Sequence, residues 1–139
     1  MGIDKPDVRY VVHYDLPKNL ESYYQETGRA GRDGLDSECL LLYSPGEYGA
    51  VRSMIERDTP DSRQARIAVR KLDEMIGYCE TTVCRRKYLL NYFGEAHAPE
   101  TCGMCDTCEG QGETIDGTAY ARAIHGCVSR CRRTPELTP

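Results

Sequence analysis

Long apolar runs are absent from this chain of 139 residues, and its first residues lack a basic stretch followed by an apolar one. A helix that spans a bilayer needs about 20 consecutive apolar residues, and a secretory signal needs a shorter apolar segment behind a charged start. We therefore expect neither a membrane span nor a signal, and no membrane partner.

An excess of positive charge is also lacking, because the formal net charge is -4 at pH 7. This balance excludes a uniformly basic nucleic-acid-binding protein. Charge is unevenly distributed, however, and only residues 62–99 contain more Lys and Arg than Asp and Glu. Hydrophobic residues make up 40% of the chain, which is enough for a folded core.

The first part of the chain alternates predicted strands and helices, as in an α/β domain. Val8–Tyr14 and Ser37–Tyr43 are rich in β-branched and aliphatic residues, which predicts two parallel strands buried on both faces. Asn19 is suited to cap a helix that ends in an arginine-rich stretch, Gly28–Gly34. A second helix is expected over Pro45–Arg57. Two strands are far fewer than such a sheet normally has.

The second part is predicted to be helical around an irregular loop. Apolar residues from Ala65 to Cys79 keep the spacing of an amphipathic helix. A helix is expected over Val83–Phe93, with Cys84 in its first turn. The next residues, Glu95–Gly117, show no apolar periodicity, so something other than a hydrophobic core must hold them. A last helix is expected from Thr118.

Three cysteines in this loop share a fixed spacing, C-x2-C-x2-C, at Cys102, Cys105 and Cys108. Such a knuckle needs a fourth ligand from elsewhere. Cys84 is suited to this role, because the positive end of its helix favours the thiolate. Four thiolates form a closed tetrahedral site, which predicts structural zinc that clips the loop to the preceding helices.

Other roles for the cysteines remain open at this stage. The same spacing begins a ferredoxin-type iron–sulfur motif, although position 112 is Gly112 instead of its fourth cysteine. Cys79 could replace Cys84 as the fourth ligand, but it completes the apolar face of its helix, so a core role is favoured. His97 is a further candidate. Cys39 is expected to be an incidental thiol in its strand. Two more cysteines near His125 could form a second site, but core burial on one helix face with Ile124 and Val128 is favoured: Cys127 and Cys131.

The arginine-rich stretch places Arg29 and Arg32 three residues apart beside glycines that allow close approach. Guanidinium groups in such a loop suit phosphate oxygens. A solvated turn, with the arginines paired to Glu26 and Asp33, is the alternative.

Three segments resemble motifs of one family in the same order. Gln25–Gly34 resembles motif VI of superfamily-two helicases, and Met1–Arg9 is similar to motif V of the RecQ family of DNA helicases. The zinc subdomain of that family resembles Cys84–Glu95 together with Cys102–Cys108. The resemblance implies the C-terminal portion of a RecA-like (P-loop NTPase type) α/β helicase domain, followed by a helical zinc-binding subdomain.

The resemblance also implies roles for single residues. Arg32 would be the arginine finger that reaches the γ-phosphate of ATP held on the preceding domain. Arg29 would assist at the phosphates, Gln25 would line the nucleotide cleft, and Asp4 would touch the ribose or the interdomain network. The parent activity would be an ATP-dependent 3'-to-5' DNA helicase of recombination and repair, cytoplasmic at the nucleoid in bacteria or nuclear in eukaryotes.

Two departures from the family bear on this chain. It has no G-x-x-x-x-G-K-[ST] and no D-E-x-H box, so ATP and magnesium would be bound by an upstream helicase domain and the chain alone is expected to be inactive. Met1 aligns with an interior residue of the family's proteins, which suggests a fragment.

The expected divisions are a partial RecA-like domain over 1–58, the zinc subdomain over 59–110, and a truncated winged-helix start over 111–139. A non-catalytic zinc module that binds nucleic acid or protein is the second hypothesis.

Contacts with single-stranded or forked DNA are predicted from charge. Seven basic residues concentrate in the only net-basic segment, and a solvated helix face is the alternative: Arg63, Arg66, Arg70, Lys71, Arg85, Arg86 and Lys87. Of these, Arg85, Arg86 and Lys87 are placed closest to the zinc loop.

Overall fold

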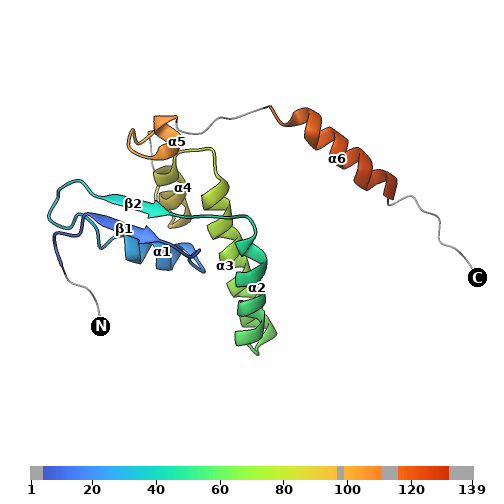
Figure 1. Cartoon of the computed structure of the whole chain (residues 1–139), viewed down its shortest axis with the longest axis horizontal. Coiled ribbons are helices and arrows are strands. Elements are labelled where there is room, and N and C mark those ends of the chain that lie inside the picture. Colours follow the sequence, from blue (N-terminus) through green and yellow to red (C-terminus); the bar gives the residue numbers. More distant parts are fainter. Residues whose placement is uncertain (1–4, 97–98, 111–115, 132–139) are drawn as a thin grey trace, which may run out of the picture.

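Residues 5–96, 99–110 and 116–131 are described by a computed structural model, in which helices predominate over one small sheet (Figure 1). The elements in chain order are β1 (Tyr10–His13), α1 (Leu20–Thr27), β2 (Glu38–Leu41), α2 (Glu47–Asp58), α3 (Ser62–Glu80), α4 (Arg85–Tyr92), α5 (Asp106–Glu109) and α6 (Thr118–Cys131). The predicted strand–helix–strand–helix order of the first part is confirmed.

β1 and β2 pair in parallel, as predicted, with Tyr10 opposite Glu38 and His13 opposite Leu41. The expectation that both faces are buried is wrong. Side chains alternate along a strand, and the face that carries His13 and Leu41 lies toward the core, whereas Val12 and Leu40 on the other face are 59% and 53% exposed. Within the described residues, helices cover only the inner face, which leaves an apolar outer face in solvent.

Helix α1 begins where the sequence predicts. The Asn19 side chain accepts a hydrogen bond from the Ser22 amide at 2.8 Å, so it satisfies one of the free N–H groups of the first turn. Leu20 and Tyr23 are buried on the face that lies toward α3. This places the C-terminal end of α1, and the arginine-rich stretch after it, next to β1.

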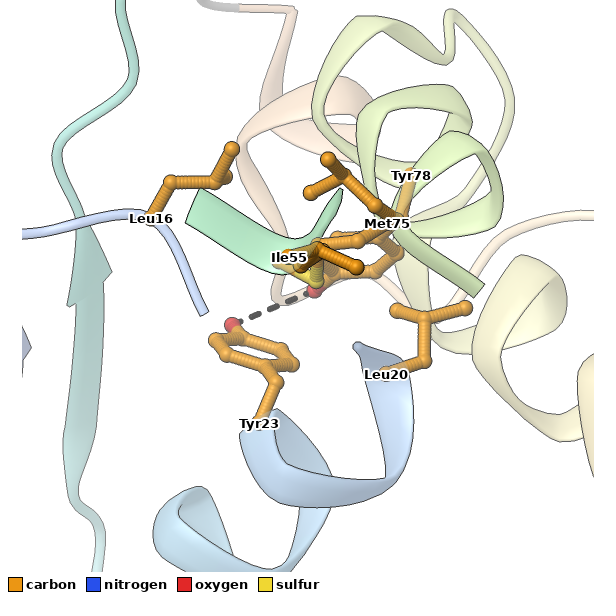
Figure 2. Close-up of a cluster of buried hydrophobic side chains, with 7 residues drawn as sticks. Leu16, Leu20, Tyr23, Ile55, Met75 and Tyr78 are labelled. Carbon is orange, nitrogen blue, oxygen red and sulfur yellow. Dashed lines mark hydrogen bonds between the residues drawn. The ribbon is translucent and has the colours of Figure 1, made fainter. Parts of the chain in front are cut away.

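Helix α3 supplies the centre of the core (Figure 2). Asp61 caps it by accepting hydrogen bonds from the Arg63 and Gln64 amides. Leu72 and Met75 are fully buried, and the Tyr78 hydroxyl donates to the Tyr23 hydroxyl at 3.3 Å. The core therefore joins residues that are far apart in the chain, since Tyr23 and Tyr78 are separated by 55 positions.

Helix α4 begins later than predicted, at Arg85 instead of Val83, and Cys84 is its N-cap residue instead of a first-turn residue. The reason lies in the preceding turn, where the Thr81 hydroxyl accepts a hydrogen bond from the Val83 amide at 3.3 Å. The helix ends at Tyr92, one residue before the predicted end, with Phe93 as its C-cap, and Gly94 follows with a positive φ of 80°.

Helix α6 begins at Thr118 as predicted and lies apart from the other helices in Figure 1. The expected burial of one face is wrong, since Ile124 is 65% exposed and Cys127 is also exposed. The apolar spacing of this helix has no packing partner among the described residues. None of the described helices combines the length and apolar character needed to cross a bilayer.

Candidate functional site

Four cysteine sulfurs that are distant in sequence meet at one point. Cys84 comes from the start of α4, Cys102 from the following loop, and Cys105 and Cys108 from the short helix α5. All four sulfurs lie within 4.8 Å of one another, and the Sγ atoms of Cys102 and Cys108 are 3.9 Å apart. Zinc–sulfur bonds of about 2.3 Å in a tetrahedron place sulfurs about 3.8 Å apart, so the four residues fit a zinc ion.

Backbone geometry explains how a short segment brings three sulfurs together. Gly103 has a φ of 68°, in the left-handed region that favours glycine, and turns the chain between Cys102 and Cys105. Cys105 is the N-cap residue of α5, so that Cys108 follows one turn later, and the Cys108 amide donates to the Cys105 carbonyl at 2.9 Å. The Cys102 amide donates to the Cys108 sulfur at 3.4 Å.

The protonation of the cluster favours thiolates at two positions. Burial alone raises the pKa of Cys84, but hydrogen bonds from the Lys87 amide, from Cys102 and Cys108, and from the Arg86 amide lower that pKa overall. Burial also acts against the Cys105 thiolate, yet hydrogen bonds led by the one from Thr107 lower the pKa of Cys105 to about 6. The predicted effect of the α4 N-terminus on Cys84 is confirmed in direction.

Of the cysteines outside the cluster, the three whose side chains the structure describes do not join it: Cys39, Cys79 and Cys127. Cys79 is half-buried against the core, and burial raises the pKa of its thiol to about 11, which agrees with the predicted core role. Cys39 and Cys127 are exposed. His97 and the Cys131 side chain lie outside the described residues, so neither candidate is placed.

An ion pair outside the cluster connects two of the segments that carry its sulfurs, and no sequence pattern predicts this pair. Arg85 donates to both carboxylate oxygens of Asp106, with Nη2 to Oδ2 at 2.8 Å, and also to the Tyr78 carbonyl at 2.6 Å. Arg85 follows Cys84 and Asp106 follows Cys105, so the pair ties the backbones beside two of the four sulfurs. The Thr107 hydroxyl lies 3.1 Å from both the Val83 carbonyl oxygen and the Cys105 sulfur, and its single proton can be donated to one of them at a time.

The arginine loop, residues Gly28–Gly34, lies after α1 and contacts the β1 segment, which here means residues 8–13 and includes β1. The Gly31 amide donates to the Val8 carbonyl at 3.0 Å, and Gly31 has a φ of 64°. A Cβ at this glycine would meet the Leu35 carbonyl at 2.9 Å, so the position has no room for a side chain. The tight path of the loop therefore depends on Gly31.

Three of the four residues predicted to contact the nucleotide lie in the described part of the chain, at the end of α1 and in the arginine loop. Arg29 is half-buried and Arg32 is exposed, with Nε of Arg32 3.5 Å from the Gly28 carbonyl. Gln25 is exposed on the last turn of α1. Asp33 pairs with Arg9, which binds both its oxygens. Asp4 lies outside the described residues.

The seven basic residues proposed for DNA divide into two groups. Three are half-buried and form ion pairs: Lys71 with Glu21, Arg85 with Asp106, and Lys87 with Glu100. Four are exposed without an acidic partner at ion-pair distance in the described part of the chain: Arg63, Arg66, Arg70 and Arg86. The first three of these occupy the N-terminal half of α3, away from its end at α4 (Figure 1).

Comparison with known families matches both parts of the chain. The model for the RecQ zinc-binding region matches residues 45–109, which contain the four cysteines. The model for the helicase conserved C-terminal domain matches residues 1–34, which contain the arginine loop.

Individual relatives agree with these matches. The chain is 43% identical over 132 residues to the ATP-dependent DNA helicase RecQ of Bacillus subtilis, a match that covers 95% of this chain and 22% of that protein. It is 42% identical over 144 residues to the RecQ-like DNA helicase blm-1 of Caenorhabditis elegans, covering 96% of this chain and 15% of the relative. It is 48% identical over 119 residues to the RecQ-like DNA helicase BLM of Xenopus laevis, a match that covers 80% of this chain and 9% of that protein. The chain thus spans less than a quarter of the length of these relatives, and it belongs to the RecQ family of helicases.

Proposed function

We propose that this chain is part of an ATP-dependent DNA helicase that moves 3'-to-5' and acts in recombination and repair, at the nucleoid in bacteria or in the nucleus. The observation that carries the proposal is the presence, in one packed body, of an arginine loop and a four-sulfur cluster, connected through α3. The relatives named above are DNA helicases, which supports the same assignment.

In this proposal residues 1–58 belong to the second RecA-like domain, residues 59–110 form the zinc subdomain and residues 111–139 begin a winged-helix domain. Cys84, Cys102, Cys105 and Cys108 hold one zinc ion. When bound, the ion supplies a cross-link and no open coordination position for substrate. The sulfurs attach the loop that follows α4 to the start of that helix.

The arginine loop acts at a nucleotide held by an upstream domain. Arg32 stabilises charge on the transferring phosphoryl group, because a guanidinium can donate to two of its oxygens at once. Arg29, half-buried at the base of the loop, assists at the phosphates, and Gln25 lines the nucleotide cleft. Asp4 contacts the ribose or the interdomain network. Magnesium and ATP bind upstream, since this chain has no phosphate-binding loop of its own.

DNA contacts in this proposal fall on the unpaired basic residues. Arg63, Arg66 and Arg70 are three and four positions apart, so they lie on one face of α3. Their guanidinium groups bind phosphates without reading bases. Arg86 adds a contact at the start of α4. Of the residues first placed near the zinc loop, Arg85 and Lys87 are engaged in ion pairs and contribute through the local positive field.

The test compares the chain with the complete helicase that includes its upstream domain. The purified chain is expected to show no ATP turnover, and the complete enzyme to show turnover that DNA stimulates. Arg32→Ala should lower kcat about a thousandfold while ATP still binds, since a finger acts on the transition state. Arg57→Ala, an exposed arginine paired with Asp58, is the matched control and should leave kcat unchanged. Normal turnover by Arg32→Ala would refute the role of this arginine.

A second function is favoured by one specific observation, the absence of a P-loop from the sequence. In that case the chain is a non-catalytic zinc module for nucleic acid or protein. The discriminating result is DNA binding by the chain alone that depends on zinc, together with no stimulation of any ATPase when an upstream domain is supplied.

A further inference from the structure

A buried histidine contacts the helix that leads into the arginine loop. His13 is only 8% exposed, at the end of β1, and its Nε2 lies 2.6 Å from Oε2 of Glu26 in the last turn of α1. The His13 ring also packs against Tyr23, with centroids 5.1 Å apart. Its other nitrogen, Nδ1, is buried and has no hydrogen-bond partner in the described part of the chain.

These contacts determine what the histidine can do. A carboxylate is only an acceptor, so Nε2 must donate the proton in the His13–Glu26 bond. A buried histidine that left both nitrogens unpaired would carry a desolvation penalty. Glu26 therefore offsets the cost of burying the His13 ring by accepting its hydrogen bond. The buried ring in turn holds the Glu26 side chain in place.

Glu26 is coupled to the arginine loop through the backbone. Its carbonyl accepts a hydrogen bond from the Arg29 amide at 3.2 Å, directly at the start of the loop. Further along the loop, the Gly31 amide binds the Val8 carbonyl and Asp33 binds Arg9. The β1 segment thus holds the loop near its start, its middle and its end.

We propose that His13 is a positioning residue for the arginine loop, acting through Glu26 to set where Arg29 and Arg32 stand relative to the nucleotide. This inference rests on the proposed role of Arg32. Phosphoryl transfer depends on exact placement of charge, and a misplacement of about 1 Å lowers rates by about a hundredfold. Loss of the His13–Glu26 bond frees one end of the loop while the other two ties remain.

The test uses the complete helicase with His13→Ala, His13→Gln and Glu26→Ala. His13→Ala and Glu26→Ala should lower kcat for ATP about tenfold or more, with KM for ATP changed less than about twofold, since the finger acts mainly on the transition state. His13→Gln places an amide N–H near the position of Nε2 and should restore most of kcat. In this chain alone, His13→Ala should accelerate hydrogen exchange at the Arg29 amide and leave the Leu72 amide protected.

Tyr78→Phe is the matched control, because it removes the buried hydroxyl that binds Tyr23 and does not touch the arginine loop. It should lower stability and leave kcat unchanged. The inference is overturned if His13→Ala keeps normal kcat while Arg32→Ala does not, or if Tyr78→Phe lowers kcat as much as His13→Ala. If Arg32→Ala itself keeps normal kcat, the proposed function fails and the inference fails with it.

Discussion

Arg85 and Asp106 form a two-armed ion pair that joins the first residue of α4 to the first residue of α5, with Nε to Oδ1 at 2.5 Å and Nη2 to Oδ2 at 2.8 Å. The side chain of Arg85 is 23% exposed, so the pair is partly shielded from solvent. Each partner directly follows a cysteine of the cluster. The pair therefore limits how far Cys84 and Cys105 can move apart.

Asp106→Asn should weaken zinc binding by about tenfold or more, the usual effect of losing a residue that orients metal ligands. The matched control is Glu100→Gln, which removes the ion pair between Lys87 and an 85% exposed carboxylate of the same loop. Competition with a chromophoric zinc chelator measures both affinities. Equal affinity in the two variants would show that the Arg85–Asp106 pair has no part in holding the site.

One zinc ion per chain is expected by elemental analysis of the purified protein. Cys105→Ser should lower the zinc content strongly, because serine at this position is a poor ligand in a four-sulfur site. Cys39→Ser, which changes an exposed thiol outside the cluster, should keep one zinc per chain. Iron with visible absorption, or full zinc content in Cys105→Ser, would contradict the assignment.

DNA binding should depend on the three unpaired arginines of α3. Replacing Arg63, Arg66 and Arg70 with alanine should weaken binding to single-stranded DNA of any sequence and reduce the slope of log affinity against log salt by about 2, at about 0.7 per phosphate contact. Fluorescence anisotropy over a range of salt concentrations measures this slope.

The control for the DNA experiment is the pair Arg52→Ala and Arg57→Ala, which removes two arginines that already bind Glu56 and Asp58. Affinity and salt slope should stay close to those of the parent chain. If the variant without Arg63, Arg66 and Arg70 has the same affinity and salt slope as this control, the α3 face does not contact DNA and its arginines are solvated.

Acid should remove the contribution that the Glu21–Lys71 ion pair, between α1 and α3, makes to the stability of the fold. Partial burial raises the pKa of Glu21, but hydrogen bonds from Lys71, from its own backbone and from Tyr92 lower it overall. A lowered pKa in the folded state stabilises the protein above the ordinary carboxyl pKa of about 4.3, and this contribution is lost as pH falls through the folded value.

Glu21→Gln should therefore lower the free energy of unfolding at neutral pH by no more than about 1 kcal/mol, since both side chains are partly exposed. The difference from the parent chain should disappear below about pH 4. Urea unfolding at a series of pH values measures it, with Glu56→Gln, from an exposed pair on α2, as the comparison. A difference that persists unchanged in acid would exclude the Glu21–Lys71 pair as its source.

Local signals in the sequence predicted most of the elements. The cap at Asn19, the apolar spacing of α3 and the glycine at 94 each act within a few residues, so they are visible without the fold. The cysteine spacing predicted three members of the metal cluster, and the place of Cys84 at a helix start favoured it as the fourth over Cys79 and His97. Here the sequence sufficed because the ligands' chemistry restricts which residues can meet.

Features that depend on neighbours in space were missed. Strand burial was wrong because an aliphatic strand such as β2 looks the same whether or not a helix covers its outer face. The predicted burial of one face of α6 was wrong for the same reason, because apolar spacing along a helix does not show whether another element covers it. The sequence also could not show which of the basic residues are neutralised, since Lys71 and its partner Glu21 are 50 positions apart.

Helix α3 contacts α1, α2 and α4, and its Leu72 and Met75 complete the core that α1 begins. A protein shortened to residues 1–61 would keep both strands but lose the helix that buries Leu20 and Tyr23. Conversely, a protein that begins at Ser62 would expose the same side of α3 to water. Recombinant segments for biophysical work should therefore contain both the arginine loop and the cysteine cluster, because neither half has a closed interior by itself.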